Sequence, residues 1–416
     1  MEKRKEKNAL MVAYAFYETD NRVRRYAETL VNEGWCVDAI VLGANGQNKK
    51  EIISGVSVHR IQRRDRNEKN QLSYLSRIIL FMIKSSLYLT IKHAFKKYSF
   101  IHVHSLPDFE IFAAAIAKML GAKIVLDIHD IVPELYASKF RKGINSIVCK
   151  MLIVIEKLSC RFADHVIVSN DVWCDRLVKR SIGREKCTTI LNYPVTEIFK
   201  KKLRKNRSDK SGKITLIYPG TLNYHQGLDV AIKAVARIRE SLKMFEFQIY
   251  GKGPEEEKLK SMVVKEKLNN IIKFEEMIPL ELVAQKMAMA DIGIVPKRAE
   301  GYGGEAFSTK ILEFMAVGTP VVISRTKIDQ HYFDESLVLY FESGNEKDLA
   351  EKILFLINNP GKRAMLSNNA LEFVKENSWG IKKGIYLDIV DTLVMSGKLK
   401  KKNALKKEQL LIESKN

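Results

Sequence analysis

Acidic residues, cysteine pairs and long apolar runs are all scarce in this sequence, and each absence excludes a class of protein. The five cysteines are odd in number and form no Cys-x-x-Cys pair, so we expect neither a zinc knuckle nor a disulfide framework. Such cysteine usage is typical of a reduced, cytosolic protein. No uninterrupted stretch reaches the ~18–20 apolar residues that span a bilayer, so we expect no transmembrane segment.

The sequence starts with a basic segment, which we do not expect to be part of a secretory signal. The short apolar run ALMVAYAF follows, and no small-residue cleavage site comes after it. The sequence has 416 residues, of which 46% are hydrophobic. This is enough for two globular domains with full cores.

The shortage of acidic residues leaves a strong positive charge. The 70 lysines and arginines face only 49 aspartates and glutamates, which gives a formal net charge of +21. This charge predicts attraction to nucleic acid or to the anionic leaflet of a membrane. The basic residues gather in the segments RIQRRDR, KHAFKK, KFRKG, FKKKLRKNRSDKSGK and KLKKKNALKK. These runs lack interleaved aromatic residues and show no recognition module, so nucleic acid is the less favoured partner.

Short β-branched runs alternate with helical patterns in two successive series. The first series includes ALMVAYAF, CVDAIVLGA, FIHVHS and KIVLDIHD, and the second includes KITLIYPGT, EFQIYGKG and IIKFEEM. Two such series predict two doubly wound α/β domains with parallel sheets. We place the domains at residues 1–197 and 198–378, with the basic stretch Lys200–Lys213 as the linker. A helical pattern at 379–396 is expected to pack back on the first domain, and residues 397–416 form a basic tail.

The segment from Gln71 to Lys97, QLSYLSRIILFMIKSSLYLTIKHAFKK, is both apolar and basic. The simplest interpretation is a helix packed on the first sheet. The alternative is that one end of it presents apolar and basic side chains to a membrane.

Polar residues follow several of the predicted strands, at the position where open α/β sheets bind ligands. In the first half these residues are His104, Asp127, His129 and Asp130, and in the second half they are Thr221, His225, Gln226, Lys252, Lys297 and Arg298. A lone histidine is more often structural than catalytic. Two histidines at adjacent strand ends, one of them beside an aspartate, make a functional role about as well supported as a structural one.

The segment GYGGEAFSTKILEFMAVGTPVVIS places charges on a helix that is otherwise apolar. Ser308 is the expected N-cap, and a glycine and a proline end the helix. Lys310 and Glu313 could form an i,i+3 ion pair worth about 0.2–0.5 kcal/mol. That pair does not explain Glu305, which lies just before the helix N-terminus, where free N–H groups favour an anion. Because carboxylates accept hydrogen bonds, sugar hydroxyl groups would be suitable partners for Glu305.

The segment EAFSTKILEFMAVGTPVV resembles the E-x7-E signature of retaining glycosyltransferases of family 4, which have the GT-B fold. The segments DNRVRRYAETLVNEGW, VLDIHDIVPELY, YPGTLNYHQGLDVAIKAV and IYGKGPEEEKL are similar to family segments in the same order. The resemblance covers roughly residues 9–396. It implies two Rossmann-like domains that face an interdomain cleft, and an enzyme of bacterial cell-surface polysaccharide type.

The resemblance also implies roles for individual residues. Glu313 would bind the ribose hydroxyls of a nucleotide diphosphate sugar, and Glu305 would meet the donor sugar near the reacting carbon. Backbone N–H groups at Phe307 and Ser308 would hold the diphosphate. The expected catalytic residues are Glu305, His129 and Asp130, the expected acceptor-side residues are His104, Asp20 and Arg22, and the expected donor-binding residues are Gly220, Thr221, His225, Gln226, Lys252, Phe307, Ser308, Lys310 and Glu313.

The sequence departs from the family pattern at the diphosphate. Many members carry an Arg and a Lys-Gly after the first strand of the second domain, but here that loop reads GTLNYHQG. The charge would then be met by Lys310, Lys297 or Arg298, or by helix ends alone. No Asp-x-Asp motif occurs, the nearest pattern being DFE at Asp108–Glu110, so we expect no metal and no cofactor besides the nucleotide sugar. The first-domain loop AFYETDNRV also lacks the paired glycines usual in the family.

The sequence therefore predicts a retaining, metal-independent hexosyltransferase. The expected reaction moves a sugar, with UDP favoured as the nucleotide, to a polyprenyl-linked saccharide in cell-surface polysaccharide or envelope glycan synthesis. The expected location is the inner, cytoplasmic face of the cell membrane, with basic residues on anionic lipid. Two alternatives stay open: an inactive homologue that binds nucleotide sugar or membrane without catalysis, and a basic nucleic-acid-binding protein.

Overall fold

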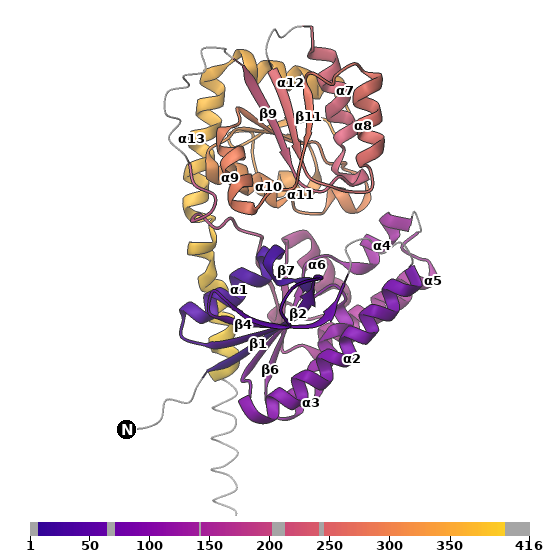
Figure 1. The fold of residues 1–416 in the computed structure, drawn as a ribbon, viewed down its shortest axis with the longest axis vertical. Coiled ribbons are helices and arrows are strands. Elements are labelled where there is room, and N and C mark those ends of the chain that lie inside the picture. The colour runs from indigo at the N-terminus through magenta and orange to yellow at the C-terminus, as the bar shows by residue number, and fades with distance from the viewer. Residues whose placement is uncertain (1–6, 65–70, 141–142, 202–212, 241–244, 396–416) are drawn as a thin grey trace, which may run out of the picture. The chain divides into compact units, whose positions relative to one another are not determined.

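The chain forms two compact units in the computed structural model, each built on one sheet with helices packed against it (Figure 1). The structure describes residues 7–64, 71–140, 143–201, 213–240 and 245–395. The first unit comprises Met1–Leu191 and Lys383–Asn416, and the second comprises Asn192–Lys382.

The first unit contains an eight-stranded sheet in the order β3-β4-β2-β1-β5-β6-β7-β8. Its strands are β1 (Asn8–Phe16), β2 (Cys36–Gly43), β3 (Lys50–Ile53), β4 (Val56–Arg63), β5 (Phe100–His104), β6 (Lys123–Ile128), β7 (His165–Val168) and β8 (Cys187–Thr189). Its helices are α1 (Asn21–Asn32), α2 (Gln71–Lys96), the 3₁₀ helix η2 (Asp108–Ala114), α3 (Ala115–Met119), α4 (Val132–Phe140), α5 (Ile147–Phe162) and α6 (Asp171–Arg180).

All strand pairs of this sheet are parallel except the edge hairpin β3–β4, which is antiparallel. The parallel strands come from near-continuous apolar runs: Ala9–Ala13 of β1 are at most 1% exposed, because a parallel sheet is covered on both faces. The strands predicted in the first series are confirmed. The hairpin was not predicted because β3 is short and exposed, with a turn at Ser54 and Gly55 that adopts positive φ angles of 49° and 80°.

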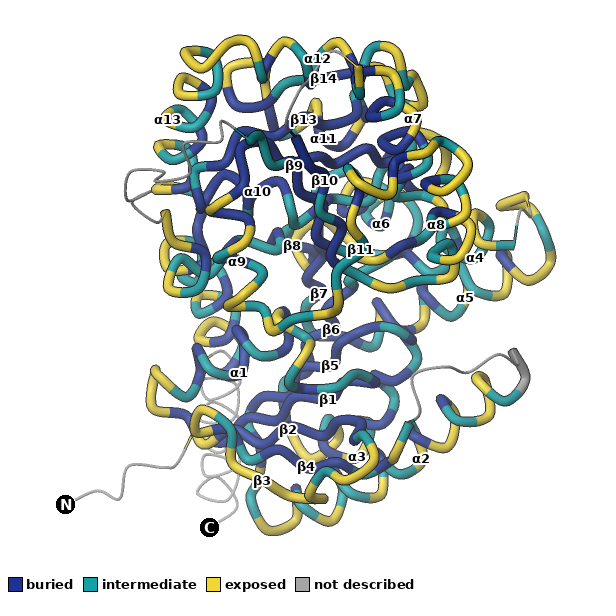
Figure 2. Tube along the Cα trace, turned by 45° about the horizontal axis from the view of Figure 1, so that its top comes forward, coloured by how far each residue is buried: buried dark blue, intermediate teal, exposed yellow. Residues whose placement is uncertain are grey.

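The second unit contains a six-stranded parallel sheet in the order β11-β10-β9-β12-β13-β14. Its strands are β9 (Ile214–Pro219), β10 (Phe245–Tyr250), β11 (Ile272–Glu275), β12 (Ile292–Val295), β13 (Val321–Ser324) and β14 (Leu339–Phe341). Its helices are η4 (Tyr224–Gln226), α7 (Leu228–Ile238), α8 (Glu256–Lys265), α9 (Leu280–Met289), η5 (Gly301–Gly304), α10 (Thr309–Val317), α11 (Lys327–Tyr332), α12 (Glu346–Asn358) and α13 (Pro360–Glu376). Figure 2 shows the strands of both sheets buried and the helices exposing their outer sides.

The division between the units differs from the predicted boundary at residue 198. Tyr193, Ile198 and Phe199 pack into the core of the second unit, so this unit begins at Asn192. Most of the predicted linker, at residues 202–212, and the predicted tail at 397–416 lie outside the described residues.

A last helix covers residues 379–395, and its part from Lys383 onward belongs to the first unit. Tyr386 on this helix is fully buried. Its hydroxyl lies 3.1 Å from His102 Nδ1, and its ring centre lies 4.4 Å from that of Tyr26. The end of the chain therefore completes the core of the first unit.

Helix α2 is the one helix among the described residues that is long and apolar enough to cross a membrane, over Ser73–Lys96. The expectation that no segment reaches this length and composition is therefore wrong. Only 28% of its most apolar 18-residue stretch is buried. Its inner side still packs on the domain, with Phe81 and Leu89 fully buried and contacts to η2, β1 and β4. One side of the helix is thus a packed core element, and the other is open apolar surface.

Candidate functional site

A pocket of about 210 Å³ lies in the first unit at the point where the strand order reverses. Strand β1 has β2 on one side and β5 on the other, and open α/β sheets bind ligands at such a point. The polar side chains that line the pocket come from Tyr14, Asp20, Arg64, Tyr74, His104, Ser105, His129 and Asp130. Four of the predicted site residues, Asp20, His104, His129 and Asp130, are therefore brought together by the fold.

A buried carboxylate, Asp127, holds the two histidines of this pocket. Its Oδ2 lies 3.2 Å from His129 Nε2 and 3.3 Å from His104 Nδ1. His104 is buried, whereas the His129 side chain is 20% exposed and is the one that a ligand can reach. Burial lowers the pKa of His104, so this imidazole is neutral at neutral pH. The arrangement can orient His129 toward a hydroxyl group.

Arg22, which we expected on the acceptor side, does not line the pocket. Its guanidinium binds Asp127 through two N–O contacts of 2.6 and 2.7 Å and donates to the carbonyl of Ile190 at 2.9 Å. Burial tends to raise the pKa of Asp127, but Arg22 and the histidines hold it well below its usual range. Arg22 is therefore a positioning residue that keeps Asp127 ionised beneath the histidines.

Replacing Arg22 with methionine should destabilise the first unit by about 3–5 kcal/mol, because it leaves a buried carboxylate without its main partner. Thermal and urea unfolding would measure the loss. Arg24→Met is the matched control on the same helix, since Arg24 makes only a partly exposed i,i+4 pair with Glu28 at 3.1 Å. A loss for Arg22→Met no larger than for Arg24→Met would contradict this role.

One group among the described residues, His102, His104 and Asp127, has potential metal-ligand atoms within 4.8 Å of one another. All three residues are buried, and both oxygens of Asp127 already accept hydrogen bonds from Arg22. A cation there would have to displace the guanidinium inside the core. The group fits a positioning network better than a metal site, and independence of metal stays a prediction.

In the second unit, the loops after β9, β10 and β12 converge near the start of α10. These three strands are adjacent, and the strand order reverses at β9. A Cβ on Gly251 would lie 1.8 Å from the Gly220 carbonyl oxygen, and one on Gly304 would lie 2.0 Å from that of Ala299. Only glycine allows this close approach of backbone to backbone, which is what a phosphate-binding cradle requires.

Helix α10 begins and ends as predicted. Ser308 is the N-cap, Thr309–Val317 is helical, and Gly318 ends the helix in the left-handed region with φ of 72°. An N-cap serine usually accepts a hydrogen bond from the first turn, but in the described part of the chain Ser308 Oγ is buried without a partner. This helix start is therefore suited to an acceptor from outside the chain, such as a phosphate oxygen.

Lys310 is the cation that faces this cradle. Its Nζ donates to Gln226 Oε1 at 3.2 Å and lies 5.2 Å from the centre of the Tyr218 ring. A Cβ on Gly220 would come within 3.0 Å of the same nitrogen, so the glycine leaves room for it. Burial lowers the pKa of Lys310 to about 8, against the opposite effect of Glu313. A desolvated ammonium of this kind is well placed to neutralise a diphosphate.

Lys297 and Arg298, the other cations expected to meet the diphosphate, are already paired. Lys297 Nζ contacts the two oxygens of Asp329 at 2.9 and 3.0 Å and the Ala306 carbonyl at 2.7 Å. Arg298 donates to Asp229 at 2.6 Å. Their acidic partners lie 32 and 69 residues away in the sequence, and a role of either cation at the diphosphate stays a prediction.

The two glutamates of the signature lie on either side of the α10 start. Glu305 ends η5, where its backbone N–H donates to the Tyr302 carbonyl at 3.1 Å, and its side chain is partly exposed. Glu313 is partly exposed on α10, one turn after Lys310. Both carboxylates are therefore partly exposed to solvent.

The remaining donor-side residues occupy different environments. Thr221 and Lys252 are exposed on the loops after β9 and β10. His225 is partly buried, and burial followed by the charge of Lys310 lowers its pKa. Phe307 packs on α11, with its ring centre 5.1 Å from that of Tyr332. Phe307 can therefore offer a ligand its backbone, while its ring is held by the protein.

Two residues that shape these sites, Arg64 and Tyr218, were missed from the sequence. Arg64 lies over the rings of Tyr14 and Tyr74, at 5.0 and 5.1 Å, and lines the first-unit pocket. The Tyr218 hydroxyl lies within hydrogen-bond distance of the Thr221 carbonyl oxygen, at 2.9 Å, and of Gln226 Oε1, at 3.1 Å, and this holds the loop after β9. Arg64 belongs to the basic segment RIQRRDR, but nothing local distinguishes it from its neighbours. Tyr218 is hidden within a predicted strand.

Family models match both halves of the chain. Residues 19–192 match a glycosyl transferase 4-like domain, and residues 199–373 match the glycosyl transferases group 1 domain.

An uncharacterized glycosyltransferase of Methanocaldococcus jannaschii is 32% identical over 184 residues, which are 42% of this chain and 48% of that protein. The putative colanic acid biosynthesis glycosyltransferase WcaL of Escherichia coli is 26% identical over 164 residues, 39% of each chain. The amylovoran biosynthesis glycosyltransferase AmsK of Erwinia amylovora is 28% identical over 154 residues, 37% of each. The chain thus spans about half the length, or less, of the curated relatives it matches.

Solved structures share the fold at low sequence identity. Sucrose-phosphate synthase from Thermosynechococcus elongatus has a TM-score of 0.75 at 17% identity, covering 96% of this chain and 100% of that one. Anabaena HepE in complex with UDP has a TM-score of 0.69 at 16% identity, covering 92% and 100%. WaaG, described as a glycosyltransferase involved in lipopolysaccharide biosynthesis, has a TM-score of 0.67 at 14% identity, covering 93% and 99%. With both of its units matched by family models, the chain belongs to the group 1 glycosyltransferases of the GT-B fold.

Proposed function

We propose that this protein is a retaining glycosyltransferase that moves a sugar from a nucleotide diphosphate sugar to a lipid-linked saccharide. UDP is the favoured nucleotide, and the product would belong to a cell-surface polysaccharide or envelope glycan. Relatives named for colanic acid and amylovoran biosynthesis support the product class, and the complex of HepE with UDP-glucose supports the donor class.

The observation that carries the proposal is the start of α10. Ser308 Oγ is buried without a partner in the described part of the chain, and Lys310 keeps a desolvated ammonium beside the loop after β9. An anion site of this kind, flanked by the carboxylates Glu305 and Glu313, fits a diphosphate with hydroxyl-bearing groups at both ends. The combination of an anion site with two flanking carboxylates supports this ligand more strongly than either feature alone.

In this mechanism the charge that develops on the departing diphosphate is stabilised by Lys310 and the first turn of α10. The departing phosphate oxygen can itself take the proton of the acceptor hydroxyl, so no strong base is needed. His129, held by Asp127 at 3.2 Å, would orient that hydroxyl. These side chains and backbone dipoles serve the reaction without a metal ion.

The acceptor side is assigned to the first-unit pocket. Its lining combines hydroxyl-binding side chains with the guanidinium of Arg64, which suits a saccharide carried on a lipid phosphate. A polyprenyl-linked acceptor resides in a membrane, so the enzyme would work as a peripheral protein at its cytoplasmic face. The net charge of +21 favours that location over a soluble acceptor.

Titration calorimetry with UDP-sugars, GDP-sugars and a nucleic-acid duplex would test this function, followed by NMR of the anomeric configuration of the product. We expect micromolar-range binding of one nucleotide sugar and retention of its configuration. Binding without turnover on any acceptor would make the protein an inactive homologue. Salt-steep binding of the duplex, with no response to nucleotide sugars, would overturn the proposal.

Replacing Glu313 with alanine should weaken UDP binding about 10- to 100-fold and leave kcat of saturated enzyme nearly unchanged. The reason is that the nucleotide changes little during the reaction, so its contacts act equally in ground and transition states. The matched control is Glu351→Ala on α12, where the side chain is exposed. If UDP affinity in Glu313→Ala equals that of the control, the carboxylate serves the helix rather than the donor.

A further inference from the structure

Helix α2 exposes a continuous apolar stripe. Its members recur every fourth residue and are between 41% and 83% exposed: Leu75, Ile79, Ile83, Leu87, Ile91 and Phe95. The opposite side, with Ile78, Phe81 and Leu89, is buried against the domain. Core packing therefore uses one side of the helix and leaves the other without a partner among the residues that the structure describes.

Helix α5 carries a second stripe of the same kind. Ile147, Met151, Val154 and Leu158 are between 51% and 79% exposed, while Cys149 on its inner side is fully buried. Between the two helices, α3 and the residue after it add exposed Met119 and Leu120. We call these exposed side chains of α2, α3 and α5 the apolar face.

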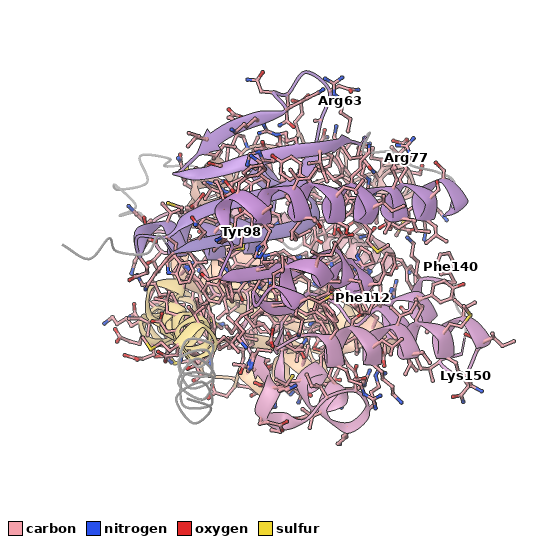
Figure 3. All side chains as sticks on the ribbon, turned by 90° about the horizontal axis from the view of Figure 1, so that it is seen from below. Arg63, Arg77, Tyr98, Phe112, Phe140 and Lys150 are labelled. Carbon is pink, nitrogen blue, oxygen red and sulfur yellow. The ribbon has the colours of Figure 1, made fainter. Side chains whose placement is uncertain are left out.

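The apolar face is one surface because its helices share a support. Both α2 and α5 pack on η2, and α3 follows η2 directly in the chain. Figure 3 shows α2 with Arg77 and α5 with Lys150 crossing the same side of the first unit, with Phe112 of η2 between them. The stripes of separate helices thus add to a single broad area.

The exposed charges on α2, α3 and α5 have one sign. Neither α2 nor α3 contains an acidic residue, and the one glutamate of α5, Glu156, is buried and paired with Arg180. Lys97 follows α2, and Lys150 and Arg161 stand exposed on α5. A rim of this kind repels a second copy of the same surface and attracts an anionic one.

We infer that the apolar face inserts into the surface of an anionic lipid bilayer, with its basic rim on the headgroups. Burying several large apolar side chains in the acyl region, added to electrostatic attraction, is how interfacial helices bind. Helix α2 lies along the bilayer rather than across it, because spanning would strip its inner side from β1, β4 and η2.

In the docked orientation, the first-unit pocket would lie close to the membrane. Tyr74, in the first turns of α2, lines the same pocket as His129 and Arg64. A bilayer held against α2 would therefore lie beside the entrance through which a lipid-linked saccharide must come. This consequence rests on the proposed function, whereas the docking itself rests only on the surface.

Co-sedimentation of the full chain with vesicles tests the docking. Vesicles of phosphatidylcholine with phosphatidylglycerol should bind it, and phosphatidylcholine alone should bind it far less. The variants Leu87→Asp with Ile91→Asp, and Met151→Asp with Val154→Asp, should each weaken binding about tenfold or more. The matched controls Val264→Asp and Met289→Asp change side chains of equal exposure, 62% and 63%, in the second unit and should bind as the wild type does.

Insertion can be separated from surface adsorption by fluorescence. The native Trp35, Trp173 and Trp379 are buried, so a tryptophan at position 87 or 151 reports its own surroundings. Quenching of Leu87→Trp and Met151→Trp by lipids with brominated chains, and its absence for Met289→Trp, is the expected result. Binding without quenching, or aspartate variants of the apolar face that bind vesicles like the controls, would overturn insertion.

A dimer in solution that Leu87→Asp dissociates would assign the apolar face to a second copy of the chain instead. Each variant should still bind UDP like the wild type, because the apolar face is separate from the donor site. If the wild-type chain does not bind UDP at all, that result counts against the proposed function and not against docking.

Discussion

Glu305→Ala should lower kcat about 100-fold or more, while UDP affinity stays within about twofold of the wild type. Glu305 is assigned to the donor sugar, where charge develops as the bond to the diphosphate breaks. An interaction that strengthens in the transition state lowers turnover when it is removed and leaves nucleotide binding unaffected. Steady-state kinetics with the donor found in the binding panel would measure the first effect, and calorimetry with UDP the second.

Glu300→Ala is the matched control, because Glu300 is an exposed carboxylate at the start of the same glycine-rich turn. Glu305→Gln would keep the shape and remove the charge, and it should behave like the alanine variant if the charge matters. Equal, modest effects of Glu305→Ala and Glu313→Ala on every parameter would favour the alternative in which Lys310 and Glu313 form only a structural ion pair.

The layered architecture was readable from the sequence because its parallel strands are buried on both faces. A strand such as β1 must then be apolar throughout, and the polar residue that follows it is exposed by the fold at the sheet edge. The same logic located His104, His129 and Asp130 at one pocket. It failed for β3, a short exposed strand that carries no such pattern.

The electrostatics of the sites could not be read in the same way. Arg22 was expected on the acceptor side, yet its guanidinium is paired with Asp127, which lies 105 residues away in the sequence. Lys297 and Arg298 likewise follow a strand end but are neutralised by distant acids. Ion pairs between remote residues depend on how loops fold over the sheet, and no local spacing encodes them. Because Lys297 and Arg298 already have acidic partners, Lys310 is the strongest candidate for binding the diphosphate.

That position of Lys310 predicts a pH dependence for donor binding. The pKa of its ammonium is lowered to about 8, first by burial, so the charge is present below that pH and is lost above it. A diphosphate binds the protonated form, and above pH 8 the lysine must first take up a proton. UDP affinity should therefore be nearly level between about pH 7 and 8 and then fall by up to about tenfold per pH unit. Calorimetry in buffers of different ionisation enthalpy should show proton uptake on binding in the upper range.

Lys310→Met tests whether this lysine is the titrating group. At pH 7 it should weaken UDP binding about 10- to 100-fold, because a charge-assisted hydrogen bond to phosphate is lost from a desolvated site. The remaining affinity should be independent of pH across the range in which the wild type declines. Lys265→Met on α8 removes an exposed lysine of the same unit and should retain both the affinity and the pH profile of the wild type.

If the UDP affinity of Lys310→Met still falls above pH 8, a group other than Lys310 titrates in that range. His225 is not that group, because burial lowers its pKa below the usual range. The diphosphate would then be held by helix dipoles and backbone N–H groups, with Lys310 serving to pack the loop after β9 through Gln226 and Tyr218.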